Sequence, residues 1–115
     1  LIRKIVISTG VVTTLAGSSG SSGSANGMGT SASFNKPYRI TTDGTNLYVG
    51  DTFNYKIRQI VISTGVVTTI AGTGSSGSAN GTGTSASFFY PVGITTDGTS
   101  LYVADYGNHL IRQIE

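Results

Sequence analysis

The stretch PVGITTDGTSLYVADYGNHLIRQI, from Pro91 to Ile114, decides the fold because the chain contains it twice. The earlier copy, PYRITTDGTNLYVGDTFNYKIRQI, runs from Pro37 to Ile60. Each copy predicts three short strands: an extended run up to Asp-Gly, a run back through Leu-Tyr-Val, and a third run after a turn near Asn. Asp-Gly between alternating apolar runs is a strong hairpin signal, because both turn residues tolerate positive φ.

The remaining sequence repeats as well. Ile60 to Thr69 repeats Ile5 to Thr14 at an offset of 55 residues (60 minus 5). Gly77 to Gly81 repeats Gly23 to Gly27 at an offset of 54 residues (77 minus 23). The residue lost between them falls in a Gly/Ser loop, where a deletion costs little. The chain therefore holds two repeats and a short overlap.

Two segments rich in Gly and Ser separate the strand regions. They run from Gly17 to Ser33 and from Gly72 to Ser87. The Gly-rich part of the first, Gly17 to Gly29, lacks the Lys followed by Ser or Thr of a phosphate-binding loop, and we expect it to be a flexible, solvated loop. The triplet Asn80-Gly81-Thr82 in the second segment is an N-glycosylation signal, which makes Asn80 a candidate for glycosylation.

No segment has apolar residues at helical spacing with caps, so the chain is predicted to be all-β. Four strands of about five residues in a period near 55 are typical of a β-propeller blade, a four-stranded antiparallel meander. Runs such as IVI and LYV are apolar on both faces, as expected of a blade between two neighbours. The expected strands are Leu1–Ile7, Val11–Ala16, Phe34–Thr42, Asn46–Gly50, Tyr55–Ile62, Val66–Ala71, Phe88–Thr96, Ser100–Ala104 and Leu110–Ile114.

The strands divide the chain into about two blades, of which the last is incomplete. Residues 1–33 supply the outer strands of a split blade and a Gly/Ser loop. Residues 34–87 form a complete blade and the second loop, and residues 88–115 supply the inner three strands of another blade. Because two blades cannot close a ring, each end is expected to leave an unpaired edge and bare apolar surface.

Composition narrows the classes of function. The chain is 37% hydrophobic and 10% charged, with a net charge of +2 and no Cys. So small a charge makes a nucleic-acid partner unlikely on electrostatic grounds, and disulfides and thiolate metal sites are excluded. The sequence has no apolar run near 18 residues, so no membrane span is expected. It opens with Leu1 inside a strand-like run, and we expect a processed product or a segment of something longer.

The segment from Pro91 to Arg112 closely resembles the NHL repeat, which is named after the Asn-His-Leu found here at residues 108–110. The earlier copy keeps most of the motif but has Arg39, Gly50, Tyr55 and Lys56 where the later copy has Gly, Ala, His and Leu. The resemblance covers the chain outside the two loops. It implies four-stranded blades in which the strand after the proline is innermost and the VVTT strand is outermost.

Each copy carries an Asp after its second strand and an Arg seven residues later (58 minus 51). A charged functional site is one interpretation. A structural ion pair inside each blade is the other, and both the repetition and the resemblance favour it, since buried polar groups in a repeat fold need partners. The predicted structural links are Asp51, Arg58, Asp105 and Arg112.

No residue pattern indicates catalysis, a metal or a cofactor. Asp43 and Asp97 read as hairpin turn residues, because calcium loops need more carboxylates. Some propellers that resemble this one carry a zinc-dependent lyase, but such a site needs several His. This chain has His109 alone, with Tyr55 at the matching position. We therefore expect a protein that is not an enzyme.

The two copies differ most around the ends of their inner strands. The functional interpretation is a binding surface that alternates from blade to blade, and drift under relaxed packing is the alternative. A basic face for RNA, built from Arg3, Lys4, Lys56, Arg58 and Arg112, is a further alternative, although nucleic acid is an unlikely partner. The candidate surface residues are Lys36, Tyr38, Arg39, Phe53, Tyr55, Tyr90, Tyr106 and His109.

Assembly with other copies is the expected function. Val11 to Ala16 of one copy can supply the outer strand beside Leu110 to Ile114 of a neighbour, giving six blades from three copies, eight from four, or a filament. We expect a structural, self-assembling scaffold, secreted or at the cell surface. The alternative is a ligand-, protein- or RNA-binding propeller module in a closed ring of six or eight blades.

Overall fold

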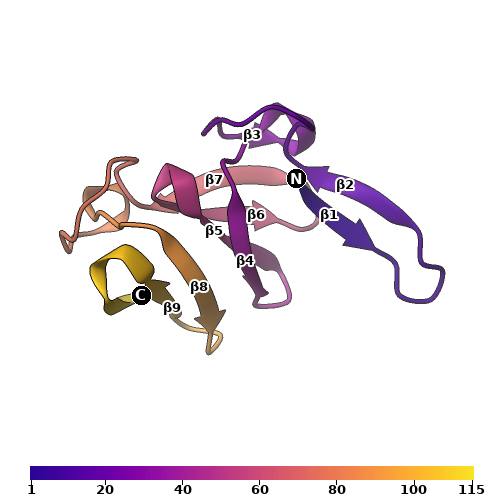
Figure 1. Cartoon of the computed structure of the whole chain (residues 1–115). Helices are drawn as coiled ribbons and strands as arrows, with labels where there is room; N and C mark the ends of the chain where they lie inside the picture. The colour runs from indigo at the N-terminus through magenta and orange to yellow at the C-terminus, as the bar shows by residue number, and fades with distance from the viewer.

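The computed structural model describes residues 1–115 and confirms the all-β fold, with ten strands, four short 3-10 helices and no α-helix (Figure 1). None of its helices has the length and hydrophobicity needed to span a membrane. All nine expected strands are present; β7 and β10 have the predicted bounds, and the others have shifted ends. The elements are β1 (Ile2–Ile5), β2 (Val12–Ala16), β3 (Gly27–Met28), η1 (Gly29–Ser31), β4 (Pro37–Thr42), β5 (Asn46–Asp51), η2 (Thr52–Asn54), β6 (Lys56–Val61), β7 (Val66–Ala71), η3 (Gly83–Ser85), β8 (Pro91–Thr96), β9 (Leu101–Asp105), η4 (Tyr106–Asn108) and β10 (Leu110–Ile114).

Blade one is the complete antiparallel meander β4-β5-β6-β7. Beyond its outermost strand lies a fifth strand, β3, which comes from the first Gly/Ser loop. Gly27 pairs with Val67 and Met28 with Val66. The loop that precedes blade one therefore closes the outer edge of that blade, which the sequence pattern did not predict.

Blade two consists of β8, β9 and β10, and no strand pairs with the outer edge of β10. At the other end of the chain, β1 and β2 form a two-stranded sheet of their own, which projects as a hairpin in Figure 1. Arg3 pairs with Thr14 in this hairpin, just as Arg58 pairs with Thr69 between β6 and β7. The hairpin thus repeats the two outer strands of a blade.

Each inner strand begins at its proline, three residues later than the sequence predicted. Lys36 and Tyr90, which precede these prolines, adopt left-handed φ values of 51° and 56°. That conformation turns the chain, so Phe34 and Phe88 are buried beside the strands rather than within them. Because bulky residues seldom adopt positive φ, the surrounding packing has to hold these two positions.

The Asp-Gly hairpins also differ in detail from the expected turn. Thr42 pairs with Leu47, which leaves four residues in the loop, and only the Gly has positive φ, 93° at both Gly44 and Gly98. The Asp acts instead through its side chain: Asp43 Oδ1 accepts hydrogen bonds from the backbone N–H groups of Thr45 and Asn46. The turn depends on a carboxylate acceptor followed by a Gly.

Two hydrophobic clusters hold the sheets face to face. One joins the β1–β2 hairpin to blade one through Ile2, Ala16, Phe34 and Val49. The other joins blade one to blade two through the equivalent residues Ile57, Ala71, Phe88 and Val103. The hairpin therefore packs on blade one in the way that the outer strands of blade one pack on blade two.

Candidate functional site

Two buried ion pairs lie at equivalent positions in the two blades. In blade one, Arg58 Nη1 donates to Asp51 Oδ2 at 2.7 Å, and both side chains are fully buried. In blade two, Arg112 Nη1 donates to Asp105 Oδ2 at 2.8 Å. The structure thus brings these four residues together inside the blades. Such charges are tolerated in a core only where partners satisfy them.

Each Arg also fixes the Gly/Ser loop that precedes its blade. Arg58 donates to the carbonyl oxygens of Ser33 and Ala25 at 2.9 and 2.8 Å and to Asn26 Oδ1 at 3.1 Å. Arg112 repeats these bonds with Ser87, Ala79 and Asn80 in the second loop. The loops are therefore tied to their blades at these residues, while most of their other residues are exposed, as expected of solvated segments.

The same Asp residues anchor the loops from the other side. Asp51 accepts from the backbone N–H of Asn35 and from Asn54 Nδ2, and Asn54 Nδ2 also donates to the carbonyl of Gly23. Asn108 does the same in blade two, with Asp105 and Gly77. The sequence analysis missed the structural role of the loop residues Asn26 and Asn80 as acceptors for the two Arg side chains, although the identical Gly-Ser-Ala-Asn-Gly in both loops was a usable signal.

Burial removes two of the cations on which a basic RNA face would depend. The guanidinium groups of Arg58 and Arg112 lie over the rings of Phe34 and Phe88 at 5.0 Å, inside the blades. Arg58 is fully buried, and Arg112 is 8% exposed. Arg58 Nε has no hydrogen-bond partner, which the contact with the aromatic ring partly offsets. The interpretation of these residues as an exposed basic patch is wrong.

The Asp residues of the two Asp-Gly turns have lowered pKa values, but no cluster of metal ligands surrounds them. Hydrogen bonds from the N–H groups of Asn46 and Thr45, and from the Tyr48 hydroxyl, hold the pKa of Asp43 below its ordinary value. Burial and the bond to Asp43 raise the pKa of Tyr48. The second turn has the same arrangement around Asp97. No group of three or more His, Cys, Asp and Glu gathers to hold a metal ion anywhere in residues 1–115.

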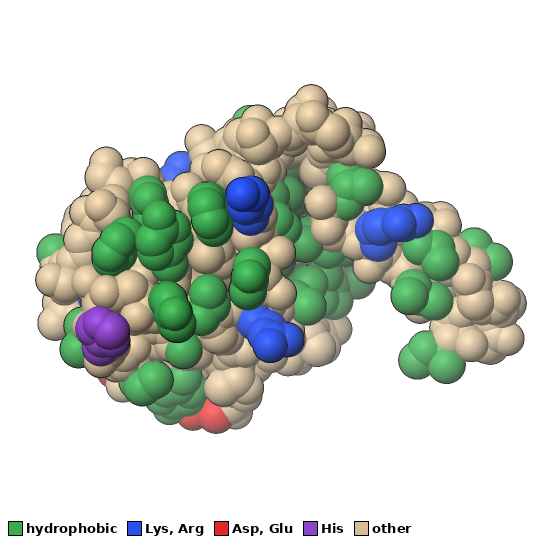
Figure 2. Space-filling model, in the orientation of Figure 1, with side chains coloured by type: hydrophobic (Ala, Val, Ile, Leu, Met, Phe, Trp, Pro, Cys, Tyr) green, Lys and Arg blue, Asp and Glu red, His purple; other side chains and the backbone are tan.

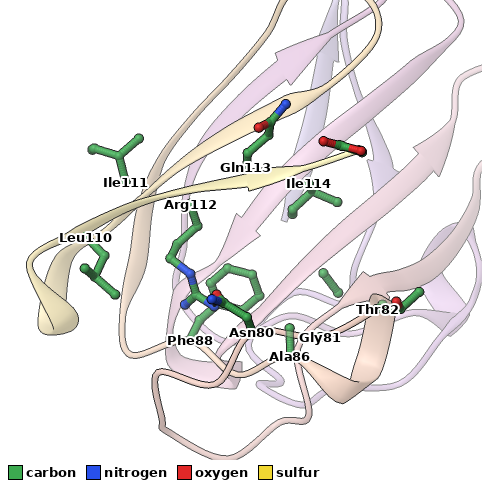
Figure 3. Close-up of a pocket in the computed structure, with 13 residues that line it drawn as sticks. Asn80, Gly81, Thr82, Ala86, Phe88, Leu110, Ile111, Arg112, Gln113 and Ile114 are labelled. Atoms are coloured by element: carbon green, nitrogen blue, oxygen red, sulfur yellow. The ribbon is translucent and has the colours of Figure 1, made fainter.

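A groove of about 560 Å³, here called the outer groove, follows the open edge of blade two (Figure 3). Strand β10 forms one rim, and Gly81, Thr82 and Gly83 of the second loop form the other. Ala71, Ala86 and Phe88 give it an apolar base. In Figure 3, Arg112, Asn80 and Phe88 converge at this groove. The groove therefore lies between strand β10 and the second loop.

Blade one shows what fits between such rims. There, β7 lies between β6 on one side and β3 on the other. Thr69 Oγ1 of β7 lies 3.2 Å from Asn26 Oδ1, to which it donates a hydrogen bond. The corresponding Asn80 Oδ1 accepts only from Arg112, at 2.9 Å. The outer groove thus corresponds in position to β7 of blade one, and Asn80 Oδ1 lacks the bond that Asn26 Oδ1 receives from that strand.

Asn80 lines the outer groove and is exposed at its edge. The carboxamide oxygen is engaged by Arg112, which fixes the direction of the side chain. Glycosylation of Asn80 stays a prediction. Because the residue faces the groove, a sugar there would occupy space that an outer strand needs.

A second concave surface, here called the face cleft, lies between the inner strands of the two blades and measures about 620 Å³. Figure 2 shows hydrophobic side chains gathered on this face, with Lys and Arg at its margin and the single His at its edge. Thr52 Oγ1 locks the blades together beneath it by donating to the Pro91 carbonyl at 2.7 Å. The lining residues are Tyr38, Arg39, Thr52, Phe53, Tyr90, Val92, Gly93, Ala104 and Tyr106.

Aromatic rings dominate the face cleft, with one cation, Arg39, in its lining and Lys36 beside it. Phe53 and Tyr90 lie 5.2 Å apart, and Lys36 Nζ lies 4.6 Å above the Phe53 ring. Tyr38 and Tyr106 are 66% and 70% exposed. The lining contains Arg39 and no carboxylate, so its charge favours an anion.

The structure therefore gathers most of the predicted binding surface. Tyr55 packs against Tyr90 at 5.4 Å, and the neighbouring Tyr90 hydroxyl raises the pKa of Tyr55. His109 is exposed at the end of η4, with a left-handed φ of 58°, and does not line the face cleft. Phe89, one of the positions at which the two copies differ, stacks on Tyr90 at 4.6 Å and completes the cluster.

No protein-family model matches the chain. NHL repeat-containing protein 2 from Bos taurus is 37% identical over 98 residues, which make up 81% of this chain and 14% of that protein. The protein of the same name from Homo sapiens is 36% identical over 98 residues, with the same coverage. The chain thus spans only a small part of these relatives.

Solved structures agree with this relation. A Bacteroides thetaiotaomicron protein of unknown function superposes with a TM-score of 0.87 and 30% identity over 96% of this chain and 28% of that chain. An auxiliary nutrient binding protein from Bacteroides ovatus gives a TM-score of 0.82 and 26% identity over 98% of this chain and 31% of that chain. The chain therefore carries two tandem NHL repeats and belongs to the NHL-repeat β-propeller family.

Proposed function

We propose that this chain is a structural propeller segment that assembles with further copies of itself, each copy filling the outer groove of the next with β2. One observation carries the proposal: the outer groove has the same two rims that hold β7 in blade one. Strand β2 has the sequence for that place. It reads VTTLA, and the same five positions of β7 read VTTIA.

The register of blade one gives the contacts at the junction. Between β6 and β7, Arg58 pairs with Thr69 and Ile60 with Val67. Transferred to the junction, this register sets Arg112 opposite Thr14 of a neighbour and Ile114 opposite Val12. Thr14 then donates to the unfilled side of Asn80 Oδ1, as Thr69 does to Asn26.

Apolar exposure at the two ends supports the proposal. Val11 and Val12 of the hairpin are 54% and 44% exposed, and Leu110 and Ile111 of β10 are 44% and 77% exposed. Burying one such side chain contributes about 1.5–3 kcal/mol. The contact is head-to-tail, so it closes a ring where the rotation between copies allows and otherwise makes a filament.

Mass measurement over a range of concentrations tests the proposal. Native mass spectrometry and light scattering are expected to show multiples of the 11.8 kDa chain. Val12→Glu places a charge in the outer groove of the neighbour and is expected to leave monomers. Ile7→Glu is the matched control, because Ile7 is 98% exposed in the hairpin turn. A wild-type chain that stays monomeric and folded at high concentration overturns the proposal.

The proposed scaffold is not an enzyme and acts outside the cell. Its surface is rich in Ser, Thr and Gly and poor in charge, and its fold needs no thiol, which suits an exported repeat protein. Fractionation of the source cells, followed by detection of the chain with an antibody, tests the location. Recovery of the chain in the cytoplasmic fraction alone contradicts it.

The face cleft supports a second candidate function, the binding of a small anionic ligand. Exposed Tyr38 and Tyr106 offer ring surfaces beside the unpaired Arg39, in a cleft of about 620 Å³. The name of the Bacteroides ovatus relative, an auxiliary nutrient binding protein, points the same way. The chain has no Trp, and Tyr38, Tyr90 and Tyr106 of its six Tyr line the cleft, so tyrosine fluorescence is a usable probe of binding there. Glucuronate is expected to quench the fluorescence of the wild-type chain, and glucose is not. Glucuronate is not expected to quench the fluorescence of the Arg39→Ala variant.

A further inference from the structure

We infer that β1 and β10 compete for the same strand, β2, and that copies join only when β1 leaves β2. The inference rests on the proposed assembly and names the step that controls it. Strand β1 then acts as a built-in competitor, which keeps β2 occupied within one chain until the β10 of a neighbour displaces it.

The two competing strands are equivalent in sequence and in pairing. Residues 1–5 read LIRKI, and residues 110–114 read LIRQI. Within one chain, Arg3 pairs with Thr14 and Ile5 with Val12. By the register of blade one, Arg112 and Ile114 of a neighbour take those same two partners. Strand β2 therefore cannot pair with β1 and β10 along the same edge at once.

A junction between two copies accordingly contains one strand too many. Blade two offers β8, β9 and β10, and the next copy offers the β1–β2 hairpin. A blade of four strands leaves either β1 or β10 without a place. If β1 is displaced, blade two stays as it stands. If β10 is displaced, the whole β1–β2 hairpin docks against β9.

The contacts of β10 decide between these outcomes. Arg112 donates to Asp105, to two loop carbonyls and to Asn80 at 2.8–2.9 Å. Removing β10 leaves the fully buried Asp105 without its cation until another Arg arrives, which is costly. Strand β10 also directly follows the η4 turn, which the bond from Asn108 to Asp105 fixes in place. Arg3 is exposed and takes part in no ion pair or side-chain hydrogen bond of the structure, so β1 is the cheaper strand to release.

Strand β1 is held to β2 by backbone pairing, with little side-chain burial. Four residue pairs join the strands, and Ile2 is the one residue of β1 that is buried, at 8% exposure. Its release therefore sets a threshold for assembly rather than a block. Assembly is expected to be slow and concentration-dependent, and to speed up when β1 is weakened.

A disulfide lock tests the inference in the full chain, which has no Cys of its own. In Ile5→Cys/Val12→Cys, oxidation ties β1 to β2, and mass spectrometry verifies the bond. The oxidised variant is expected to remain monomeric, and the reduced variant to assemble. Oxidised protein that assembles as well as reduced protein overturns the inference, because the hairpin then docks whole. If reduced and wild-type proteins both stay monomeric, the proposed assembly itself fails.

A second pair of variants distinguishes the strands without a crosslink. Arg3→Ala is expected to assemble within about twofold of the wild-type dissociation constant, whereas Arg112→Ala weakens assembly by about tenfold or more. The reverse pattern overturns the inference, since Arg3 then occupies the site of Arg112. In Val12→Cys/Ile114→Cys, oxidation is expected to link different chains into a ladder of covalent oligomers, and monomers with an internal bond contradict the register.

Discussion

Blade one and blade two carry copies of the same repeat, but only blade one is covered on its outer side. In blade one, β7 and β3 lie beyond β6, and Arg58 is fully buried. In blade two, no strand lies beyond β10, and Arg112 is 8% exposed. Even so, the Arg–Asp distances are 2.7 and 2.8 Å. The polar link is therefore built by the inner three strands and the preceding loop, and the outer strand adds burial.

The largest expected loss of stability comes from breaking the Arg–Asp ion pair of blade one, which is the more buried of the two. Arg58→Ala leaves Asp51 without its cation and is expected to cost about 3–5 kcal/mol of unfolding free energy. Arg112→Ala should cost less in the monomer, since the outer groove admits water to the site. Urea unfolding at low protein concentration measures both. Equal losses would show that the outer strand does not matter to the link.

A glycine after the outer strand tests how tightly that strand closes the blade. Gly72 has φ +103°, and a Cβ there would press on the Tyr55 carbonyl oxygen and on Lys56. Gly72→Ala is expected to cost about 1–3 kcal/mol. At the equivalent Gly17, φ is +97°, and a Cβ would meet Leu1 Cα and the Phe34 ring at 3.3 Å, which can give way. Thermal unfolding should therefore rank Gly17→Ala as the milder change, and the opposite order contradicts this account.

The loop asparagines give a smaller and more selective comparison. Asn26 Oδ1 accepts from Arg58 and Thr69, whereas Asn80 Oδ1 accepts from Arg112 alone. Asn26→Ala is expected to cost about 1 kcal/mol more than Asn80→Ala in the monomer, the value of one hydrogen bond. On assembly the two variants should become alike. A difference that persists in the oligomer argues against Thr14 as the partner of Asn80.

The turn carboxylates should show no difference between the blades. The pKa values of Asp43 and Asp97 are both lowered, chiefly by backbone N–H groups. A carboxylate with a lowered folded-state pKa stabilises the fold at pH values above the ordinary Asp pKa, near 4. That stabilisation is lost as the pH falls through the folded-state pKa. Side-chain NMR titration from pH 6 to 2 should give two similar midpoints below the ordinary value. A normal midpoint for either residue contradicts its turn geometry.

The repeat carried most of the predictable information. The recurrence of one motif predicted the strands, the blades and the open third strand, since each local pattern agreed with the others. The recurrence of Asp and Arg pointed to a paired role for Asp51 and Arg58. Both inferences needed only periodicity and the rule that buried polar groups find partners.

Other features depended on contacts that a linear pattern does not encode. Strand β3 exists because Gly27 and Met28 meet an edge supplied by a strand about forty residues later (67 minus 27). The left-handed Lys36 and Tyr90 contradict the preference of their residue types, so tertiary packing decides them. The aromatic cluster of the face cleft joins Phe53 to Tyr90 across two blades, and repeat comparison marked these positions only as different.

The hydrogen bonds from each blade Arg to the carbonyl groups of the preceding loop have a consequence for proteolysis. Residues 23–33 precede blade one in the sequence, yet Arg58 and Asn54 of that blade hold their carbonyl groups. A protease needs an extended, released segment, so cleavage in this loop reports the opening of the blade downstream of the cut. Limited digestion would then read the stability of each blade separately, with the second loop cut before the first because its blade is the open one.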